Sequence, residues 1–224
     1  MDYYEQTASV DSRVFESRLV SIEAHVSPGP LLDVGCNIGT FLNMARSRRW
    51  QGEGIEPNGK AAQRARGAGH SVYGGYFSKE WASSRRGFFQ AVTLNDVVEH
   101  VPNPVAFLSW ALDVLVPGGV LAVNTPNFAS PLARAVQVKP DEHYFYFRPE
   151  TLVRTLEAAG GRLIHLSSQG RPRNFNALKS GRTLVGRWAP WVSSLLVRTG
   201  GDRWANALIQ QFFRDELFLL AQRA

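Results

Sequence analysis

The chain has 224 residues, of which 44% are hydrophobic and 20% are charged, the proportions of a globular domain with a full core. Its single cysteine, Cys36, excludes an internal disulfide and suits a reducing compartment. No uninterrupted apolar stretch approaches the ~20 residues of a membrane span, and the N-terminus shows no signal peptide. We therefore expect a cytoplasmic protein.

The net charge of +6 is unevenly distributed along the chain. Residues 1–169 contain 16 Lys/Arg and 16 Asp/Glu, whereas residues 170–224 contain 9 Lys/Arg and 3 Asp/Glu. An electrostatic partner should therefore meet the C-terminal quarter. We expect a small-molecule partner and no nucleic acid.

The first predicted element is an amphipathic helix from about Asp11, within an N-terminal helical segment 1–29. Apolar residues recur there at steps of three and four, which is the helical period. They are Val14, Phe15, Leu19, Ile22 and Val26. The following sequence Ser-Pro-Gly-Pro at 27–30 ends the helix before the first strand.

The stretch 31–42 predicts a buried parallel strand, a glycine turn and the start of a helix. Its apolar run contains the acid Asp33, and the chain turns on Gly35 and Gly39. Gly35 permits a sharp turn, and Gly39 leaves no Cβ between the helix and a ligand. A dinucleotide fingerprint would need glycine at position 37 and near 40, where the chain has Asn37 and Thr40. An acid at 33 suits a cationic ligand, such as the amino group of a methionine moiety.

This stretch resembles motif I of the class I S-adenosylmethionine-dependent methyltransferases, whose pattern is acid-x-Gly-x-Gly-x-Gly. Asn37 stands where the pattern has its middle glycine. The resemblance implies that the cofactor contacts Asp33, Gly35, Cys36, Asn37 and Gly39.

A short second strand over 52–55 ends in Glu56 and Pro57. Glu56 lies 21 positions after Gly35, where a βαβ unit places a carboxylate for the two ribose hydroxyls of a nucleoside. A helix over about 58–68 and a weak strand over 69–73 follow. The loop 74–87 has room for one helical turn. The related families often supply an acid to the adenine there, and here Tyr76 and Phe77 are expected to contribute backbone contacts and stacking.

A strong central strand over 88–96 precedes the sequence Val-Val-Glu-His-Val-Pro-Asn-Pro at 97–104. This string resembles motif IV of methyltransferases related to the ubiquinone-pathway O-methyltransferases, and implies cofactor contacts from Asn95, Asp96 and Val97. Pro104 then begins a helix that reaches Leu115, because proline is tolerated in a first helical turn.

Two further segments resemble the same families. One is Leu-Val-Pro-Gly-Gly at 115–119 with Asn-Thr-Pro-Asn at 124–127, and the other is the aromatic loop and helix over 141–160. Strands are expected over 162–167 and 216–221, the last one antiparallel at the sheet edge. The resemblance implies a Rossmann-like fold: a seven-stranded, mostly parallel sheet with helices on both faces.

A long connection at 170–214 separates the last two strands, within what we expect to be a single domain. Its pieces 182–199 and 202–213 carry tryptophans and other apolar residues at helical spacing, with arginines on the polar side. Connections of this length are usually functional. We expect a substrate lid that would favour an anionic or apolar acceptor. Ordinary packing, a dimer contact and a weak membrane-surface contact are the alternatives.

Of the five histidines, His100 and His143 fall over the expected pocket and are the candidate catalytic residues. A histidine with a near-neutral pKa can take a proton from a hydroxyl group. His25 and His70 are expected to be exposed. The spacing of Asp96, Glu99, His100 and His143 matches no metal pattern, so we expect no metal.

The favoured reading is an S-adenosylmethionine-dependent methyltransferase acting on a small molecule, with oxygen as the target. An oxidoreductase that binds a nicotinamide dinucleotide is an alternative enzyme class, and a non-catalytic module that binds S-adenosylmethionine or a lipid surface is another. Asn37, Asp33 and the lack of a hydride-site pattern disfavour the oxidoreductase.

Overall fold

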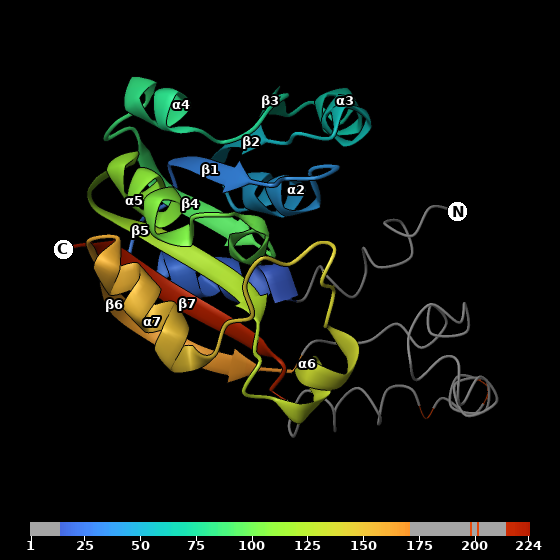
Figure 1. The fold of residues 1–224 in the computed structure, drawn as a ribbon. Helices are drawn as coiled ribbons and strands as arrows, with labels where there is room; N and C mark the ends of the chain where they lie inside the picture. The colour runs from blue at the N-terminus through green and yellow to red at the C-terminus, as the bar shows by residue number, and fades with distance from the viewer. Residues whose placement is uncertain (1–13, 171–197, 199–200, 202–213) are drawn as a thin grey trace.

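A computed structural model describes residues 14–170, 198, 201 and 214–224 (Figure 1). Residues 14–23 are helical, as the spacing of their apolar side chains predicted. Residues 1–13 and nearly all of the predicted insertion lie outside the described residues. The predicted lid and its alternatives therefore remain predictions. Within the described part of the chain, no helix is long and apolar enough to cross a membrane.

The regular elements follow one another in alternating order along most of the chain. The strands are β1 Pro30–Val34, β2 Gln51–Ile55, β3 Ser71–Tyr73, β4 Phe89–Asn95, β5 Leu115–Pro126, β6 Gly161–Gln169 and β7 Glu216–Arg223. The helices are α2 Thr40–Ser47, α3 Gly59–Gly67, α4 Lys79–Ser84, α5 Pro104–Asp113, α6 Pro131–Val136 and α7 Pro149–Ala158, with a 3₁₀ turn η1 Val98–His100. Helix α4 is the helical turn expected within 74–87, and α6 was not predicted.

The seven strands form one sheet in the order β3-β2-β1-β4-β5-β7-β6. The pairs from β3 to β5 are parallel, and β7 is antiparallel to both of its neighbours. This confirms the mostly parallel, Rossmann-like sheet. The expectation that the last strand forms the edge was wrong, because β7 lies between β5 and β6. Residues 216–221 are buried on both faces, which an interior strand requires, whereas β6 is largely half-buried or exposed.

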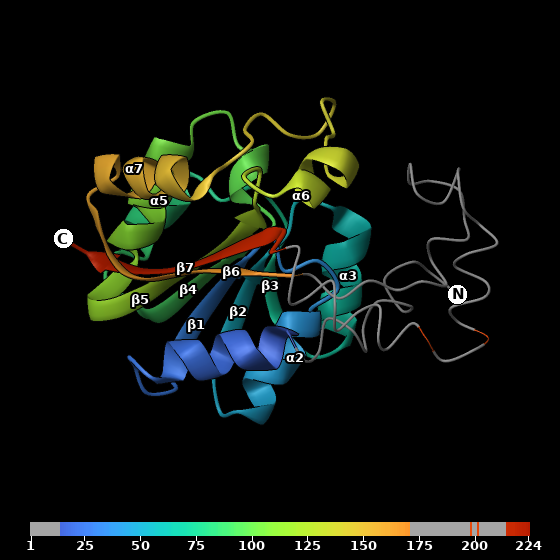
Figure 2. The same ribbon diagram turned by 90° about the horizontal axis from the view of Figure 1, so that it is seen from below.

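Helices cover both faces of the sheet, as Figures 1 and 2 show. Helices α4, α5 and α7 pack on one face over a core that includes Phe89, Leu108 and Leu156. The helical residues 14–23 pack with α2 and α3 on the other face, over a core that includes Leu31 and Leu42. Two apolar layers therefore hold the sheet between them, and its strand ends carry the polar residues.

Because β1, β2, β4 and β5 are parallel, their carboxyl ends all lie at the same end of the strands. The chain runs outward from β1 to β2 and β3, and then returns to β4 on the other side of β1. The reversal creates the crevice in which open α/β sheets bind ligands. The predicted site residues that follow these strands therefore lie together at the carboxyl ends of the strands.

Candidate active site

The turn after β1 holds three residues in left-handed backbone conformations. Gly35, Asn37 and Gly39 have φ angles of 76°, 50° and 84°. Asparagine is among the few residues with a side chain that adopt this region readily. Asn37 can therefore stand where the methyltransferase pattern has a glycine. Its Oδ1 is buried and has no hydrogen-bond partner within the described residues.

Glu56, directly after β2, ties two neighbouring turns together. Its Oε2 accepts a hydrogen bond from the backbone N–H of Asn37 (2.9 Å), and its Oε1 accepts one from the N–H of Asn58 (2.8 Å). The side chain is buried, so it is not an ordinary surface glutamate. Each carboxylate oxygen keeps further acceptor capacity, which two ribose hydroxyls could use.

Gly39 is required by the packing of the protein itself. A Cβ at this position would lie 2.8 Å from Cδ2 of His70 and 3.3 Å from Cβ of Ala65. The expectation that His70 is exposed was wrong, because its ring folds back against α2. Its Nε2 lies 2.9 Å from Oδ1 of Asn43, and burial lowers the pKa of the ring. His70 and α3 therefore limit the space at the turn.

Asp33 lies near the end of β1 and is only 2% exposed. Its Oδ1 accepts hydrogen bonds from Oγ1 of Thr93 (2.7 Å) and Nδ2 of Asn95 (3.3 Å). Burial raises the pKa of Asp33 to about 7. The two hydrogen bonds and the charge of Arg18 lower this pKa, whereas the charge of Glu56 raises it. The carboxyl group therefore titrates near neutrality.

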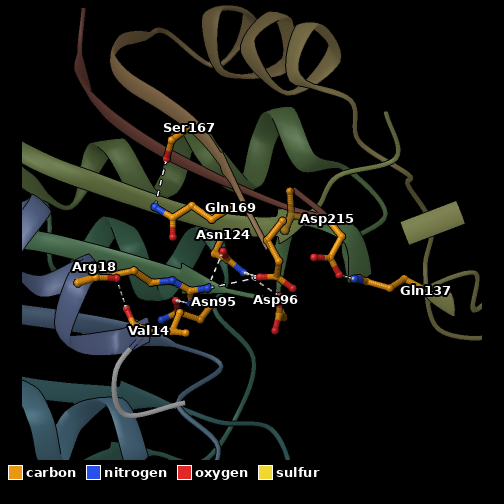
Figure 3. Close-up of polar contacts among 12 residues, drawn as sticks. Val14, Arg18, Asn95, Asp96, Asn124, Gln137, Ser167, Gln169 and Asp215 are labelled. Atoms are coloured by element: carbon orange, nitrogen blue, oxygen red, sulfur yellow. Dashed lines mark hydrogen bonds and ion pairs between the residues drawn. The ribbon is translucent and has the colours of Figure 1, made fainter. Parts of the chain in front are cut away.

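Arg18 is a site residue that the sequence reasoning missed. Its Nη1 donates to Oδ1 of Asn95 (2.7 Å), and its Nη2 donates to Oδ1 of Asn124 (2.6 Å), as Figure 3 shows. Nη2 also lies 3.4 Å from Oε2 of Glu216. The guanidinium thus connects the N-terminal helical residues to β4, β5 and β7. The available signal was an arginine beside Leu19, on the apolar face of an amphipathic helix.

Asp96 follows β4 and also has a left-handed backbone, with a φ angle of 53°. Its Oδ1 accepts a hydrogen bond from Nδ2 of Asn124 (3.0 Å), and the same amide donates to Oε2 of Glu216 (2.7 Å). The predicted residues Asn95 and Asp96 therefore lie next to Asn124. Non-glycine residues in this conformation cluster at functional sites.

The two candidate catalytic histidines contact each other. Their ring centroids are 4.7 Å apart, and Nδ1 of His100 lies 2.8 Å from the carbonyl oxygen of Glu142. His143 is 7% exposed, and its Nδ1 is buried without a hydrogen-bond partner within the described residues. Burial, followed by the charges of His100 and Lys139, lowers the pKa of His143 to about 4. The imidazole is therefore neutral at physiological pH.

Glu99 lies close to the histidine pair, with Oε1 4.0 Å from Nε2 of His100, and the sequence predicted no catalytic or cofactor role for it. Its Oε2 accepts a hydrogen bond from Oγ1 of Thr125 (2.8 Å). Burial and the nearby charge of Asp96 raise the pKa of Glu99 to about 8. One ligand atom each from Glu99, His100 and His143 lies within 4.8 Å of the others, a grouping that could hold a metal ion. Spacing along the sequence could not show this grouping, and the expectation of no metal stays a prediction.

The aromatic residues predicted to meet the adenine differ in accessibility. Tyr76 is 79% exposed at the strand-end side of β3. Phe77 is buried, and its ring packs edge-on against Phe107 with centroids 5.2 Å apart. Of this pair, Tyr76 therefore has the ring that is open to a ligand, while Phe77 supports the loop from the core.

The other predicted contacts line the turn. Cys36 is buried, which raises the pKa of its thiol, and its Sγ lies where a Cβ on Gly54 would have to go. Pro57 is exposed after Glu56. Val97 is half-buried, with Cγ2 2.7 Å from the place of a Cβ on Gly35. The chain therefore packs tightly around the backbone of the turn.

The site suits S-adenosylmethionine, a cation with a nucleoside and an amino-acid end. Asp33 and Glu56 place two buried carboxylates at the ends of the adjacent strands β1 and β2. The backbone N–H of Asn37 donates to Glu56, and its buried Oδ1, a hydrogen-bond acceptor, has no partner among the described residues. These acids could supply negative charge for a cationic end and acceptors for a ribose, so the residues present fit this cofactor.

Comparisons with known proteins agree with this fit. The family described as "Methyltransferase domain" matches residues 10–166. A ubiquinone biosynthesis O-methyltransferase of Xanthomonas axonopodis pv. citri (strain 306) is 30% identical over 190 residues, which cover 75% of this chain and 78% of the relative.

Solved structures show the same fold at lower identity. An S-adenosylmethionine-dependent methyltransferase from Archaeoglobus fulgidus superposes with a TM-score of 0.69 and 19% identity, covering 99% of this chain and 100% of that one. Phosphoethanolamine N-methyltransferase 2 of Haemonchus contortus, in complex with S-adenosyl-L-methionine, superposes with a TM-score of 0.58 and 16% identity. This match covers 93% of this chain and 52% of that one.

Proposed function

Because the chain belongs to the methyltransferase domain family and uses S-adenosylmethionine as its cofactor, we propose that it methylates an oxygen atom of a small apolar or aromatic molecule. Family membership sets aside the oxidoreductase and the non-catalytic module. When bound, the cofactor supplies an electrophilic methyl group on a sulfonium. The protein has to bind the acceptor, orient its oxygen and accept its proton.

The observation that carries the proposal is the buried Nδ1 of His143, which has no hydrogen-bond partner in the described part of the chain. A buried nitrogen without a partner is costly, and a ligand hydroxyl that donates a hydrogen bond to it removes this cost. The lowered pKa keeps the imidazole neutral, so Nδ1 has the lone pair that such a bond needs. His143 would orient the hydroxyl and accept its proton during transfer, and His100 would hold the ring of His143 in place.

The surroundings of His143 favour an apolar acceptor. Tyr144, Phe145 and Tyr146 expose between 36% and 66% of their surface, and adjoining exposed apolar side chains often mark a binding site. The backbone N–H groups of Tyr144 and Phe145 donate to the carbonyl oxygen of Glu99, so the loop is fixed to the site. A phenol can stack on such rings while its hydroxyl reaches His143.

The cofactor residues take their proposed roles from the geometry. Asp33 would attract the amino group of the cofactor, and Glu56 would accept the ribose hydroxyls. Asn37 would accept a hydrogen bond through its buried Oδ1, and Tyr76 would stack on the adenine. Gly35 and Gly39 would give the turn the left-handed backbone that it needs to approach the ligand.

The test is a panel of acceptors with release of S-adenosylhomocysteine as the readout. We expect hydroxylated aromatic compounds to be methylated on oxygen, as mass spectrometry and NMR of the product would show. Amines methylated in preference to phenols would overturn the oxygen assignment. The same assay after chelation, with and without added divalent ions, tests the prediction that no metal is needed.

A matched pair of variants tests His143. His143→Ala should lower kcat by about 10²-fold or more, the usual contribution of a general base, while S-adenosylmethionine binds as before. His25→Ala, at an exposed position outside the site, is the control. Unchanged turnover in a folded His143→Ala protein would rule out this role.

A further inference from the structure

We propose that Arg18 is a positioning residue: it fixes the side-chain amides of Asn95 and Asn124, and through Asn95 it keeps Asp33 ionised and oriented for the cationic end of the cofactor. The inference rests on the proposed role of Asp33 toward that end. It assigns a part in cofactor binding to Arg18, whose side chain hydrogen-bonds to Asn95 on β4 and Asn124 on β5.

The first step is the orientation of Asn95. Its Oδ1 accepts a hydrogen bond from Arg18 at 2.7 Å. A guanidinium has donors and no acceptor, so it must face the oxygen of the amide. Nδ2 of the amide therefore points the other way and donates to Oδ1 of Asp33 at 3.3 Å. An amide rotated by half a turn would set its nitrogen against the guanidinium and its oxygen against the carboxylate. Arg18 thus selects the orientation that supports the ionised acid.

The second step is the same arrangement at Asn124. Its Oδ1 accepts from Arg18 at 2.6 Å, and its Nδ2 donates to Asp96 and Glu216. A single guanidinium therefore fixes the amides of Asn95 and Asn124, which Figure 3 shows beside it, and each amide donates to at least one carboxylate. Through these two amides, Arg18 is connected to the carboxylates of Asp33 on β1, Glu216 on β7 and Asp96 after β4.

The third step is electrostatic. Asp33 interacts electrostatically with Glu56, Cys36 and Arg18, and it accepts hydrogen bonds from Thr93 and Asn95. Burial and the charge of Glu56 oppose ionisation of Asp33. The hydrogen bonds from Thr93 and Asn95 and the charge of Arg18 favour it. A carboxylate that must attract an ammonium has to be charged, so loss of Arg18 should weaken the attraction at neutral pH.

The test is the pH dependence of S-adenosylmethionine affinity, measured by calorimetry between pH 5.5 and 9. In the wild type, affinity should fall as pH drops through about neutrality, since Asp33 takes up a proton. In Arg18→Met the midpoint should move up by about one pH unit, and affinity at pH 7 should fall by about 5-fold, because the ionised fraction of Asp33 drops from about one half to about one tenth. Arg18→Lys keeps the charge, so its midpoint should stay near that of the wild type.

Arg48→Met is the matched control. Arg48 also fastens the N-terminal helical residues to the domain, through a salt bridge to Glu23, and lies away from the strand ends. If Arg18 merely anchored that helix, both variants would behave alike. We expect the midpoint of Arg48→Met to equal that of the wild type, and a shift of the same size in both variants would overturn the proposal.

A second variant guards against a folding defect. Arg18→Met removes the salt bridge between Arg18 and the buried carboxylate of Glu216, so Arg18→Met/Glu216→Gln neutralises both partners together. The raised midpoint should persist in this folded double variant, and an unchanged midpoint would overturn the role of Arg18. Asp33→Asn separates the two proposals: full affinity without pH dependence there would overturn the role of Asp33 itself.

Discussion

Both carboxylate oxygens of Glu56 accept backbone hydrogen bonds, one from the turn after β1 and one from the turn after β2. A single side chain thus connects the two loops between which a nucleoside would lie. Such residues shape a binding site even before a ligand arrives, because they hold the backbone that the ligand contacts. The structural and binding roles of Glu56 are therefore linked.

Glu56→Ala should lower S-adenosylmethionine affinity by about 10- to 150-fold, the loss expected for charge-assisted hydrogen bonds worth about 1.5–3 kcal/mol. It should also lower the melting temperature, since the N–H groups of Asn37 and Asn58 lose their acceptor. Calorimetry and thermal unfolding measure the two effects. Glu53→Ala, at a half-buried glutamate of the same strand, is the control and should leave affinity unchanged.

Asp33 predicts a defined relation between stability and pH. The folded protein holds the proton of Asp33 up to about pH 7, whereas the unfolded chain loses it near pH 4. The stability that this proton supplies is complete below pH 4 and is lost as pH rises to about 7. Asp33→Asn mimics the protonated acid, so its unfolding free energy should exceed that of the wild type above pH 7 by at least about 1 kcal/mol.

Denaturant unfolding of both proteins at pH 5 and pH 8 checks this prediction. The unfolding free energy of Asp33→Asn should exceed that of the wild type by more at pH 8 than at pH 5. An equal difference at both pH values would show that Asp33 is ionised in the folded protein throughout this range. A stabilised variant with weakened cofactor binding would be an instance of stability given up for function.

At the scale of elements, four segments were predictable because each carries a local pattern: the apolar run and glycines at 31–42, Glu56 at a strand end, the strand at 88–96, and the Pro-initiated helix at 149–158. The position of β7 between β5 and β6 was not predictable, because strand order depends on which faces are buried. The contacts of Asn124 with Arg18 and Glu216 escaped prediction for a similar reason, although 124–127 was recognised as a motif. These three residues lie up to 198 positions apart, and no local pattern records their contacts.

The packing of β2 against the turn after β1 gives an element-scale prediction. A Cβ on Gly54 would lie 2.4 Å from Sγ of Cys36 and 3.1 Å from Cδ1 of Leu42. Gly54→Ala should therefore destabilise the protein by about 1–3 kcal/mol through overpacking. Cys36→Ala removes the sulfur and should recover part of this loss in the double variant.

A double-mutant cycle on unfolding free energies measures the coupling between these two positions. We expect a coupling of about 0.5 kcal/mol or more in the compensating direction. Strictly additive effects would show that the clash is relieved elsewhere in the strand. Gly67→Ala, where an added Cβ meets nothing within 4 Å, is the matched control.

At the scale of the whole molecule, the two sides of the site have different characters. The cofactor side is built from the first five strands and carries buried acids, while the acceptor side is an aromatic loop beside two histidines. The predicted lid of residues 170–214 lies almost wholly outside the described residues. Deleting 171–212 should spare cofactor binding and remove methyl transfer, and an active deletion variant would contradict the lid.

A crystal structure of the protein with S-adenosylhomocysteine tests the central claim most directly. We predict that the ribose hydroxyls lie within hydrogen-bond distance of Glu56, with the amino group of the ligand on the side of Asp33 and Asn37. The sulfur should face His143 across the strand ends. A ligand bound at another edge of the sheet, or a ribose without contact to Glu56, would contradict the account.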